Sequence, residues 1–295
     1  MSGLVVVQAG ALTTVQDLGR PGWAHVGVPR SGALDVPALR AANRLVGNPD
    51  GAAALETTLT GCAVSCTSST TVAVTGAPAE VTVDGAAAAW GETVDVPAGA
   101  LVTVGSAAAG VRSYLALAGG VAVRPLLGSR STDTLSGLGP PPLTAGAHLP
   151  LGPPPPPPPH PPHPPHPSPS SIMRKWSPAE PVTVRVVPGP RDDWLTVAAR
   201  VTLAGTTWTV SQRSNRVGVR LVGPTLERAV TAELPSEGVV LGSVQVPTDG
   251  QPLVFLADHP TTGGYPVVGV VVPADLPLLA QARPGSSLRF ARTGD

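Results

Sequence analysis

The chain has 295 residues, enough for one large domain or two modest ones. Its formal net charge is zero, which argues against nucleic acid or a membrane surface as a partner. Hydrophobic residues make up 42% of the chain and aromatic residues only 3%, so the core must consist mainly of Val, Leu and Ala. No run of 18 apolar residues predicts a transmembrane helix, and the N-terminus lacks the basic start of a signal peptide. We therefore expect a cytoplasmic protein.

The chain has two cysteines and a single lysine, and their positions limit which covalent and phosphate-binding functions it can have. Cys62 and Cys66 would lie about 13 Å apart on an extended strand, too far for a disulfide, so we expect two buried thiols. The lysine, Lys175, lies beside a proline-rich tract. A phosphate-binding loop needs a lysine after a glycine-rich turn, Schiff-base catalysis needs one in a pocket, and biotin attachment needs one in an exposed turn. We expect no covalent biotin on this chain and, if ATP is used, binding of ATP with or by a partner protein.

The first half begins with a predicted strand at residues 4–7. Residues 13–35 are polar and too often interrupted by Gly and Pro for a helix or a long strand. Such a loop is either exposed and mobile or functional. Asp35 is expected to cap a helix that has Pro37 in its first turn and ends at Gly47. The buried stripe of this helix is predicted to be Leu39, Ala42, Leu45 and Val46.

From about residue 53 to residue 123 the sequence alternates between short β-branched runs and turns. Asp84 and Gly85 form a strong hairpin signal between two such runs. Strands at this spacing predict a barrel or a sandwich rather than alternating strands and helices. Residues 127–133 form a second polar loop, which is either a solvated turn or part of a ligand site.

Residues 152–171 are rich in proline and carry histidines every third position. In a polyproline II helix these histidines would project about 9 Å apart, too far for all three to bind one metal. We predict a semi-rigid spacer, with a linker at 152–181 between an N-terminal half at 1–151 and a C-terminal half at 182–295. The histidines are His160, His163 and His166.

The second half opens with a strand at 182–187 and a polar turn at 189–194 that leads into a short helix. In an extended segment, Arg216 and Arg220 would share one face. Arginines flanking a Ser-Asn turn can bind a carboxylate or phosphate, although a charged edge strand is an equal alternative. Asp275 is expected to cap a helix over 276–282, followed by a last strand at 287–290.

Residues 233–266 hold an unusual density of polar groups for a chain with 13% charged residues. A histidine beside a carboxylate, as in Asp258-His259, can move protons near neutral pH. Gly263 and Gly264 would let backbone amides approach an anion. No motif of a covalent hydrolase or a metalloprotease occurs, and no metal site is predicted. The residues indicate a polar small-molecule site with carboxylates and arginines.

Several sequence blocks occur in order along nearly the whole chain, and one is the Gly-Pro-Arg of 189–191. The other blocks are 14–22, 27–35, 43–49, 127–133, 211–221, 235–238 and 258–266. Together they resemble one family, which includes the C-type subunit of 5-oxoprolinase, the second subunit of allophanate hydrolase (a biotin-dependent carboxyltransferase-like protein) and a bacterial antagonist of a sporulation-kinase inhibitor. One departure is a run of prolines at 140–142, where relatives carry a Gly/Phe-rich segment.

The resemblance implies a mainly β fold of cyclophilin-like β-barrel architecture, with two β-rich halves and a few short helices. It implies a complex with a paralogous B-type subunit, and an A-type subunit as a further partner. Its activity would be the ATP-dependent opening of the 5-oxoproline lactam to L-glutamate. One alternative is a urea carboxylase-type carboxyltransferase subunit. Another is a non-catalytic regulator that binds a kinase-inhibitor-like partner, for which substitutions at Glu237 or His259 would leave growth on 5-oxoproline unchanged.

The predicted site combines residue types suited to an anionic substrate. We assign the acids and the histidine to proton transfer or orientation, and the arginines to a substrate carboxylate or phosphate. The predicted catalytic residues are Glu233, Glu237, Asp258 and His259. The predicted substrate-binding residues are Asp17, Arg20, Gln212, Asn215, Arg216, Arg220, Ser236, Thr262 and Tyr265.

Overall fold

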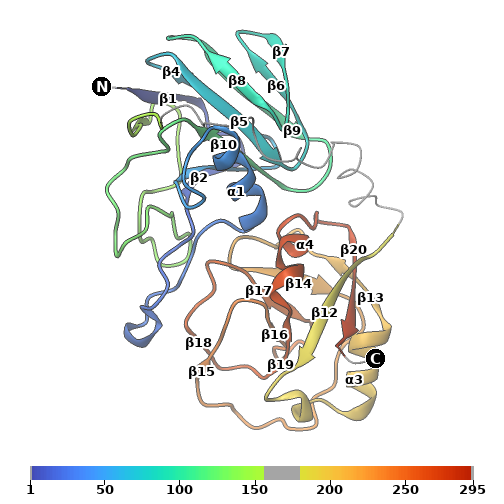
Figure 1. The fold of residues 1–295 in the computed structure, drawn as a ribbon. Helices are drawn as coiled ribbons and strands as arrows, with labels where there is room; N and C mark the ends of the chain where they lie inside the picture. Colours follow the sequence, from blue (N-terminus) through green and yellow to red (C-terminus); the bar gives the residue numbers. More distant parts are fainter. Residues whose placement is uncertain (1, 156–179, 294–295) are drawn as a thin grey trace. The chain divides into compact units, whose positions relative to one another are not determined.

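The computed structural model describes residues 2–155 and 180–293 (Figure 1). Residues 2–20 and 31–155 form one compact unit, and residues 21–30 together with 180–293 form a second. Most of the predicted linker at 152–181, with its three histidines and Lys175, lies outside the described residues. The linker and its boundaries therefore stay a prediction.

The first unit is built from two antiparallel sheets (Figure 1). The strands of the six-stranded sheet, in spatial order, are β11 (His148–Pro150), β1 (Gly3–Gln8), β4 (Cys62–Cys66), β9 (Leu101–Ala107), β6 (Ala79–Val83) and β7 (Ala86–Ala88). Those of the five-stranded sheet are β2 (Leu12–Gln16), β3 (Ala54–Thr58), β10 (Arg112–Leu117), β5 (Thr70–Gly76) and β8 (Thr93–Val96). The predicted hairpin is confirmed, with Asp84 and Gly85 at φ 49° and 81° between β6 and β7.

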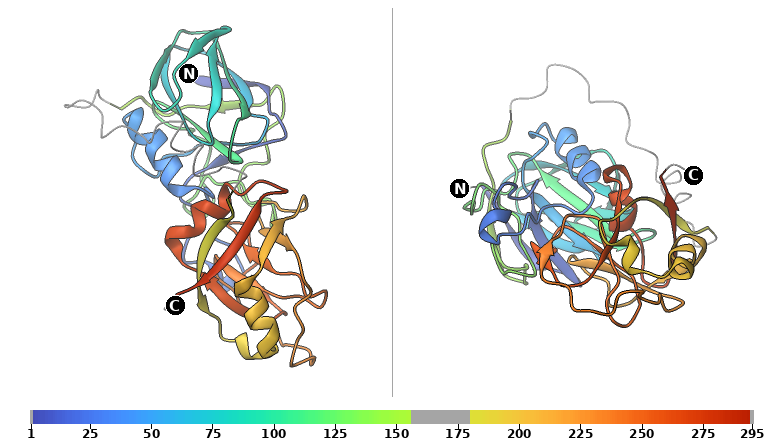
Figure 2. Two further views of the ribbon diagram at one scale, coloured as in Figure 1. Left: turned by 90° about the vertical axis from the view of Figure 1, so that its right-hand side faces the viewer. Right: turned by 90° about the horizontal axis from the view of Figure 1, so that it is seen from below.

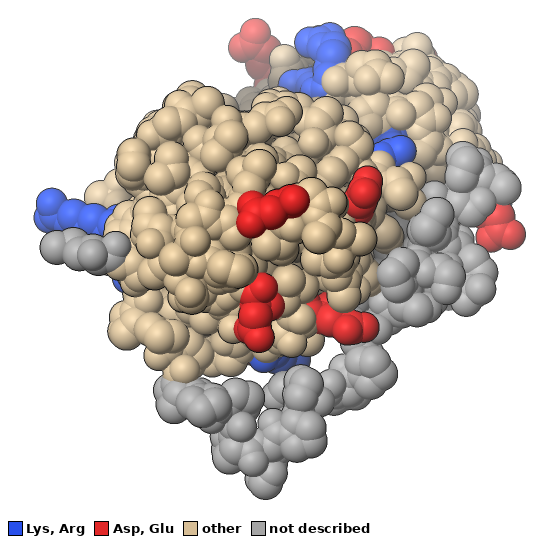
Figure 3. Space-filling model, turned by 90° about the horizontal axis from the view of Figure 1, so that it is seen from above, with Lys and Arg blue, Asp and Glu red and all other residues tan. Residues whose placement is uncertain are grey.

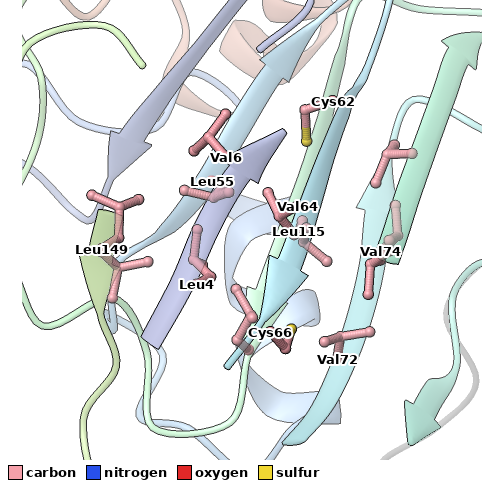
Figure 4. Packing of buried hydrophobic residues seen from close by; sticks show 14 of the residues in the cluster. Leu4, Val6, Leu55, Cys62, Val64, Cys66, Val72, Val74, Leu115 and Leu149 are labelled. Carbon is pink, nitrogen blue, oxygen red and sulfur yellow. The ribbon is translucent and has the colours of Figure 1, made fainter. Parts of the chain in front are cut away.

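Both sheets contribute side chains to one core (Figure 4). Leu4 and Val6 come from β1, and Val72 and Val74 come from β5, so alternate residues of facing strands fill the space between the sheets. Cys62 and Cys66 belong to the same core, and both are free thiols. The expectation of two buried thiols is confirmed.

Helix α1 (Val36–Leu45) covers the outer face of the five-stranded sheet. All six residues of β10 are buried, because Leu115 and Leu117 face the core between the sheets while Tyr114 and Ala116 pack against α1. The predicted cap is confirmed: the Asp35 Oδ1 accepts a hydrogen bond from Ala38 N at 3.1 Å. The helix is thereby fixed at the end of the first polar stretch.

The second unit is a closed seven-stranded barrel. Its strands, in spatial order, are β12 (Val182–Pro188), β19 (Val267–Val271), β16 (Ser243–Gln245), β17 (Leu253–Phe255), β14 (Gly218–Val222), β13 (Thr207–Val210) and β20 (Ser287–Arg292). β12 and β20 run parallel, and the other neighbours are antiparallel. The fully buried Trp208 is the largest of the core side chains. The predicted mainly β fold with a barrel is confirmed.

Short helices and one small sheet complete the second unit. Figure 2 shows α3 (Val197–Gly205) on the outside of the barrel, where it packs against β20. The two-stranded sheet consists of β15 (Glu237–Gly238) and β18 (Thr262–Gly263). The remaining helices of this unit, within the described residues, are η1 (Ala24–Val26), η2 (Asp192–Trp194), η3 (Pro273–Asp275) and α4 (Leu276–Ala280).

Two local predictions are corrected by the structure. Asp275 makes no capping hydrogen bond at α4, because its carboxylate accepts hydrogen bonds from the backbone N, Nε and Nη2 of Arg185 instead. The polar stretch at 13–35 begins with a strand, since β2 extends to Gln16 and pairs with β3. In both cases a partner distant in sequence decides the local structure.

Candidate functional site

The small sheet β15–β18 unites two of the polar blocks of the sequence. Glu237 lies opposite Gly263 in antiparallel register. Gly263 packs directly on the buried Gln245 of β16, where a Cβ would lie 2.6 Å from the Gln245 Nε2. The same Nε2 donates a hydrogen bond to the Tyr265 carbonyl at 2.9 Å. A glycine at this position therefore serves close packing, and the Gln245 amide contacts both β18 and the residues that follow it.

Glu237 is paired with Arg191, a residue that the predicted site did not include. The Arg191 Nε donates to Glu237 Oε2 at 3.1 Å, and its Nη2 donates to Oε1. This hydrogen bond is the main cause of a lowered pKa of Glu237. The side chains are 37% and 30% exposed, so the ion pair lies at the solvent boundary.

The backbone that carries Arg191 is held firmly. Arg191 N donates to the Val267 carbonyl at 3.0 Å, and Gly189 N donates to the Val268 carbonyl at 3.0 Å. A Cβ at Gly189 would lie 2.4 Å from the Val267 oxygen, so only glycine allows this approach. The Gly-Pro-Arg block thus aims one arginine at the β15–β18 sheet. That block was the signal by which Arg191 could have been found.

Arg216 and Asp258 form a buried ion pair at the end of β14 and β17. Arg216 Nε lies 2.9 Å from Asp258 Oδ2, and its Nη2 lies 3.0 Å from Oδ1. The side chains are 1% and 0% exposed. The Asp258 N also donates to the Arg216 carbonyl at 3.1 Å, which extends the ladder between the two strands. The guanidinium fork that we assigned to a substrate is therefore occupied by a carboxylate of its own chain.

His259 follows this pair and is 7% exposed. Its Nδ1 lies 2.6 Å from the Pro260 carbonyl, and its ring centroid lies 5.9 Å from that of Phe255. Because a carbonyl oxygen only accepts, Nδ1 carries a proton, and in the neutral ring Nε2 is the acceptor. The contact with the Pro260 carbonyl thus orients the imidazole ring.

The turn before β14 separates Arg216 from Arg220. Asn215 Oδ1 accepts hydrogen bonds from Val217 N at 2.9 Å and Gly218 N at 3.3 Å, which closes the turn. Arg216 precedes β14 and is buried, whereas Arg220 lies within β14 and is exposed. The prediction that both share one face is therefore wrong. It assumed an extended chain where the Asn215 side chain bends the backbone.

The other predicted residues of the second unit are exposed or partly exposed. They carry hydroxyl, amide and carboxylate groups, and Tyr265 is 42% exposed. These residues are Gln212, Glu233, Ser236, Thr262 and Tyr265. Of them, Thr262 belongs to β18 and Ser236 precedes β15, so both adjoin Glu237. The structure therefore brings together Ser236, Glu237 and Thr262 in one place and Arg216, Asp258 and His259 in another.

Asp17 and Arg20 belong to the first unit, where they organise the second polar loop. Asp17 Oδ1 accepts hydrogen bonds from the hydroxyls of Ser129 and Ser131, each at 2.6 Å. Its Oδ2 accepts from Arg130 N at 2.6 Å, and the Arg20 Nη2 donates to the Ser131 carbonyl. These donors to Asp17 all come from its own chain. This carboxylate joins the blocks 14–22 and 127–133.

The described residues contain no group of three or more His, Cys, Asp or Glu side chains arranged to hold a metal ion. No helix within the described ranges is long and apolar enough to cross a membrane. On the face shown in Figure 3, the Lys and Arg side chains do not gather into one basic patch. On this face the basic side chains are therefore scattered.

Comparison with known proteins identifies the family. The family model "Carboxyltransferase domain, subdomain A and B" matches residues 26–292. The chain belongs to this family. It is 38% identical over 292 residues to the C-type subunit of 5-oxoprolinase from Escherichia coli (strain K12), covering 98% of this chain and 91% of that protein.

Two solved structures share the fold. The chain covers 55% of the chain in the crystal structure of TTHA0988, with 38% identity over 99% of its own length and a TM-score of 0.85. The chain covers 18% of the urea amidolyase in the crystal structure from K. lactis, with 31% identity over 98% of this chain and a TM-score of 0.87. The chain therefore spans about half of the first of these relatives and a small part of the second.

Proposed function

We propose that this chain is a subunit of an ATP-dependent 5-oxoprolinase complex that helps to activate the 5-oxoproline lactam for ring opening to L-glutamate. The supporting observation is the 38% identity to the C-type 5-oxoprolinase subunit of E. coli across 98% of this chain. The carboxylates and arginines of the second unit suit a small anionic substrate, because a guanidinium binds a carboxylate through two parallel hydrogen bonds.

The chain works with partner subunits in this proposal. The sequence offers no lysine-bearing phosphate loop and no biotin attachment site, so ATP is bound with or by a partner. A paralogous B-type subunit is the first partner, with an A-type subunit as a further one. The E. coli relative is named as one subunit of 5-oxoprolinase, which supports a complex of several chains.

A reconstitution assay tests the function. The chain is combined with its B-type and A-type partners, and ATP hydrolysis is measured with and without 5-oxoproline, together with L-glutamate release. We expect ATP hydrolysis to depend on 5-oxoproline and to fall to background when this chain is left out. ATP hydrolysis that does not respond to 5-oxoproline would reject the proposal.

A carboxyltransferase role of the urea carboxylase type is the second candidate. It is favoured by the 31% identity and TM-score of 0.87 to the K. lactis urea amidolyase. The two candidates differ in their need for biotin. Inhibition of the reconstituted activity by avidin would favour the carboxyltransferase role, whereas insensitivity to avidin would favour the lactam-opening role.

A further inference from the structure

The Arg191–Glu237 ion pair already has the geometry of carboxylate recognition. Two parallel hydrogen bonds join the guanidinium to both carboxylate oxygens, and a substrate carboxylate would adopt the same arrangement. Both side chains are about one-third exposed, so an incoming ligand can reach them. Exposed ion pairs contribute little to stability, and so replacing one carboxylate with another disturbs the fold little.

Two other arginines near the polar blocks, Arg216 and Arg228, are less suited to this task. Arg216 is 1% exposed and its fork is filled by Asp258. Arg228 donates from Nε to the Val230 carbonyl and from Nη2 to the Ala232 carbonyl, both at 3.1 Å. Arg191, in contrast, has an accessible side-chain partner on a separate small sheet and a backbone locked to β19. The backbone of Arg191 is thus held by hydrogen bonds, while its side-chain partner Glu237 is partly exposed to solvent.

We propose that Arg191 is the residue that binds the substrate carboxylate, and that the Glu237 carboxylate occupies the Arg191 guanidinium until the substrate binds. On binding, the ligand carboxylate takes over the two hydrogen bonds from Arg191, and the Glu237 side chain is released beside the bound molecule. No covalent bond is made or broken in this exchange. The inference rests on the proposed function, because 5-oxoproline carries both the carboxylate and the lactam.

The exchange gives a common role to the block at 189–191, which carries Arg191, and the block at 235–238, which carries Glu237. Gly189 allows the close approach that fixes Arg191, and Gly263 allows β18 to dock on Gln245 and so to hold β15 in place. Glu237, released from Arg191, loses the hydrogen bond that lowers its pKa. Its pKa therefore rises on substrate binding, which brings the side chain closer to the range useful for proton transfer.

The test uses the reconstituted complex, with KM for 5-oxoproline as the readout. Arg191→Gln should raise KM about 10- to 100-fold, as expected for the loss of a charge-assisted pair of hydrogen bonds. Glu237→Gln should lower KM, because a neutral amide competes less strongly for Arg191. The double variant should behave like Arg191→Gln alone, since the competitor no longer matters once its arginine is absent.

Two controls separate this role from general damage. Arg44→Gln removes another bidentate, exposed pair, with Asp50 at 2.5 and 2.6 Å, and should leave KM unchanged. The second control is 2-pyrrolidinone, a lactam without a carboxylate, for which kcat/KM should not respond to Arg191→Gln. If ATP hydrolysis by the wild-type complex does not respond to 5-oxoproline, the proposed function itself is rejected. If the wild type is active, either an unchanged KM in Arg191→Gln or a raised KM in Glu237→Gln overturns the carboxylate exchange.

Discussion

Replacing Asp258 with alanine should destabilise the barrel far more than replacing Glu237, although each carboxylate is bound by an arginine through two hydrogen bonds. Asp258 and Arg216 are 0% and 1% exposed, whereas Glu237 and Arg191 are 30% and 37% exposed. Removing one partner of a buried pair leaves a charge inside the protein, while an exposed arginine regains water. Burial therefore sets the expected difference.

The magnitudes follow from that contrast. Loss of one partner of a buried ion pair lowers the free energy of unfolding by about 3–5 kcal/mol, whereas loss of a solvent-exposed pair lowers it far less. Domain stabilities of about 5–15 kcal/mol leave Asp258→Ala marginal or unfolded and Glu237→Ala close to wild type. The urea midpoint should fall by more than about 1 M in the first variant and by less than about 0.5 M in the second.

Hydrogen exchange measured along a urea titration locates the loss. Peptides covering β14 and β17 should lose protection first in Asp258→Ala, because residues 216 and 258 extend the ladder between those strands. Asp258→Asn keeps the shape of the side chain and is the variant to measure if Asp258→Ala does not accumulate as folded protein. Equal midpoints for the Asp258 and Glu237 variants would refute the reasoning that burial decides the role of each pair.

Three further predictions concern the first unit. Cys62 and Cys66 should not react with Ellman's reagent at pH 8 until urea is added, because burial raises their pKa values to about 12 and about 11. These folded pKa values lie above the usual value of 9.0, so the stability that the thiols contribute should be complete below pH 9 and lost as the pH rises toward 11–12. Alkaline unfolding of the variant with both cysteines replaced by alanine checks this. Its free energy of unfolding should depend less on pH than that of the wild type. Asp17→Ala should expose the loop at 127–133 to limited proteolysis and lower the free energy of unfolding by about 2–4 kcal/mol, and an unchanged cleavage pattern would contradict this. Tyr114→Phe removes the hydroxyl that donates to Glu56 and accepts from Asp35 N, so calorimetry should show a loss of about 1–3 kcal/mol.

The sequence predicted features whose causes lie within a few residues. The cap at Asp35 and the two-residue turn at 84–85 depend on local backbone geometry, and both are confirmed. Strand geometry predicted that Cys62 and Cys66 form no disulfide, and both are free and buried. The mainly β fold could likewise be predicted, because short β-branched runs separated by turns leave few other architectures.

Features decided by distant partners could not be predicted in the same way. Asp275 has the residue type of a helix cap, yet it binds Arg185 from 90 positions away. Glu237 was expected to act on a substrate, and its partner Arg191 lies 46 positions earlier in a block that looked like a turn. Arg216 lies beside a Ser-Asn turn, but the destination of its side chain depends on Asp258. Residue type indicates which groups a side chain can bind, and only the fold decides which of them lie within reach.

The resemblance blocks combine two roles that sequence comparison alone does not separate. Blocks 14–22 and 127–133 meet at Asp17, which is 6% exposed and accepts hydrogen bonds from its own chain, so their pairing serves architecture. Blocks 189–191 and 235–238 meet at Arg191 and Glu237, where solvent reaches both charges. In the proposed exchange, a substrate carboxylate would replace Glu237, whereas the buried Asp17 keeps its hydrogen bonds to the loop at 127–133. Solvent access alone does not distinguish Arg191, because the Arg44–Asp50 pair is exposed as well. The proposal for Arg191 rests on accessibility together with its position beside the β15–β18 sheet.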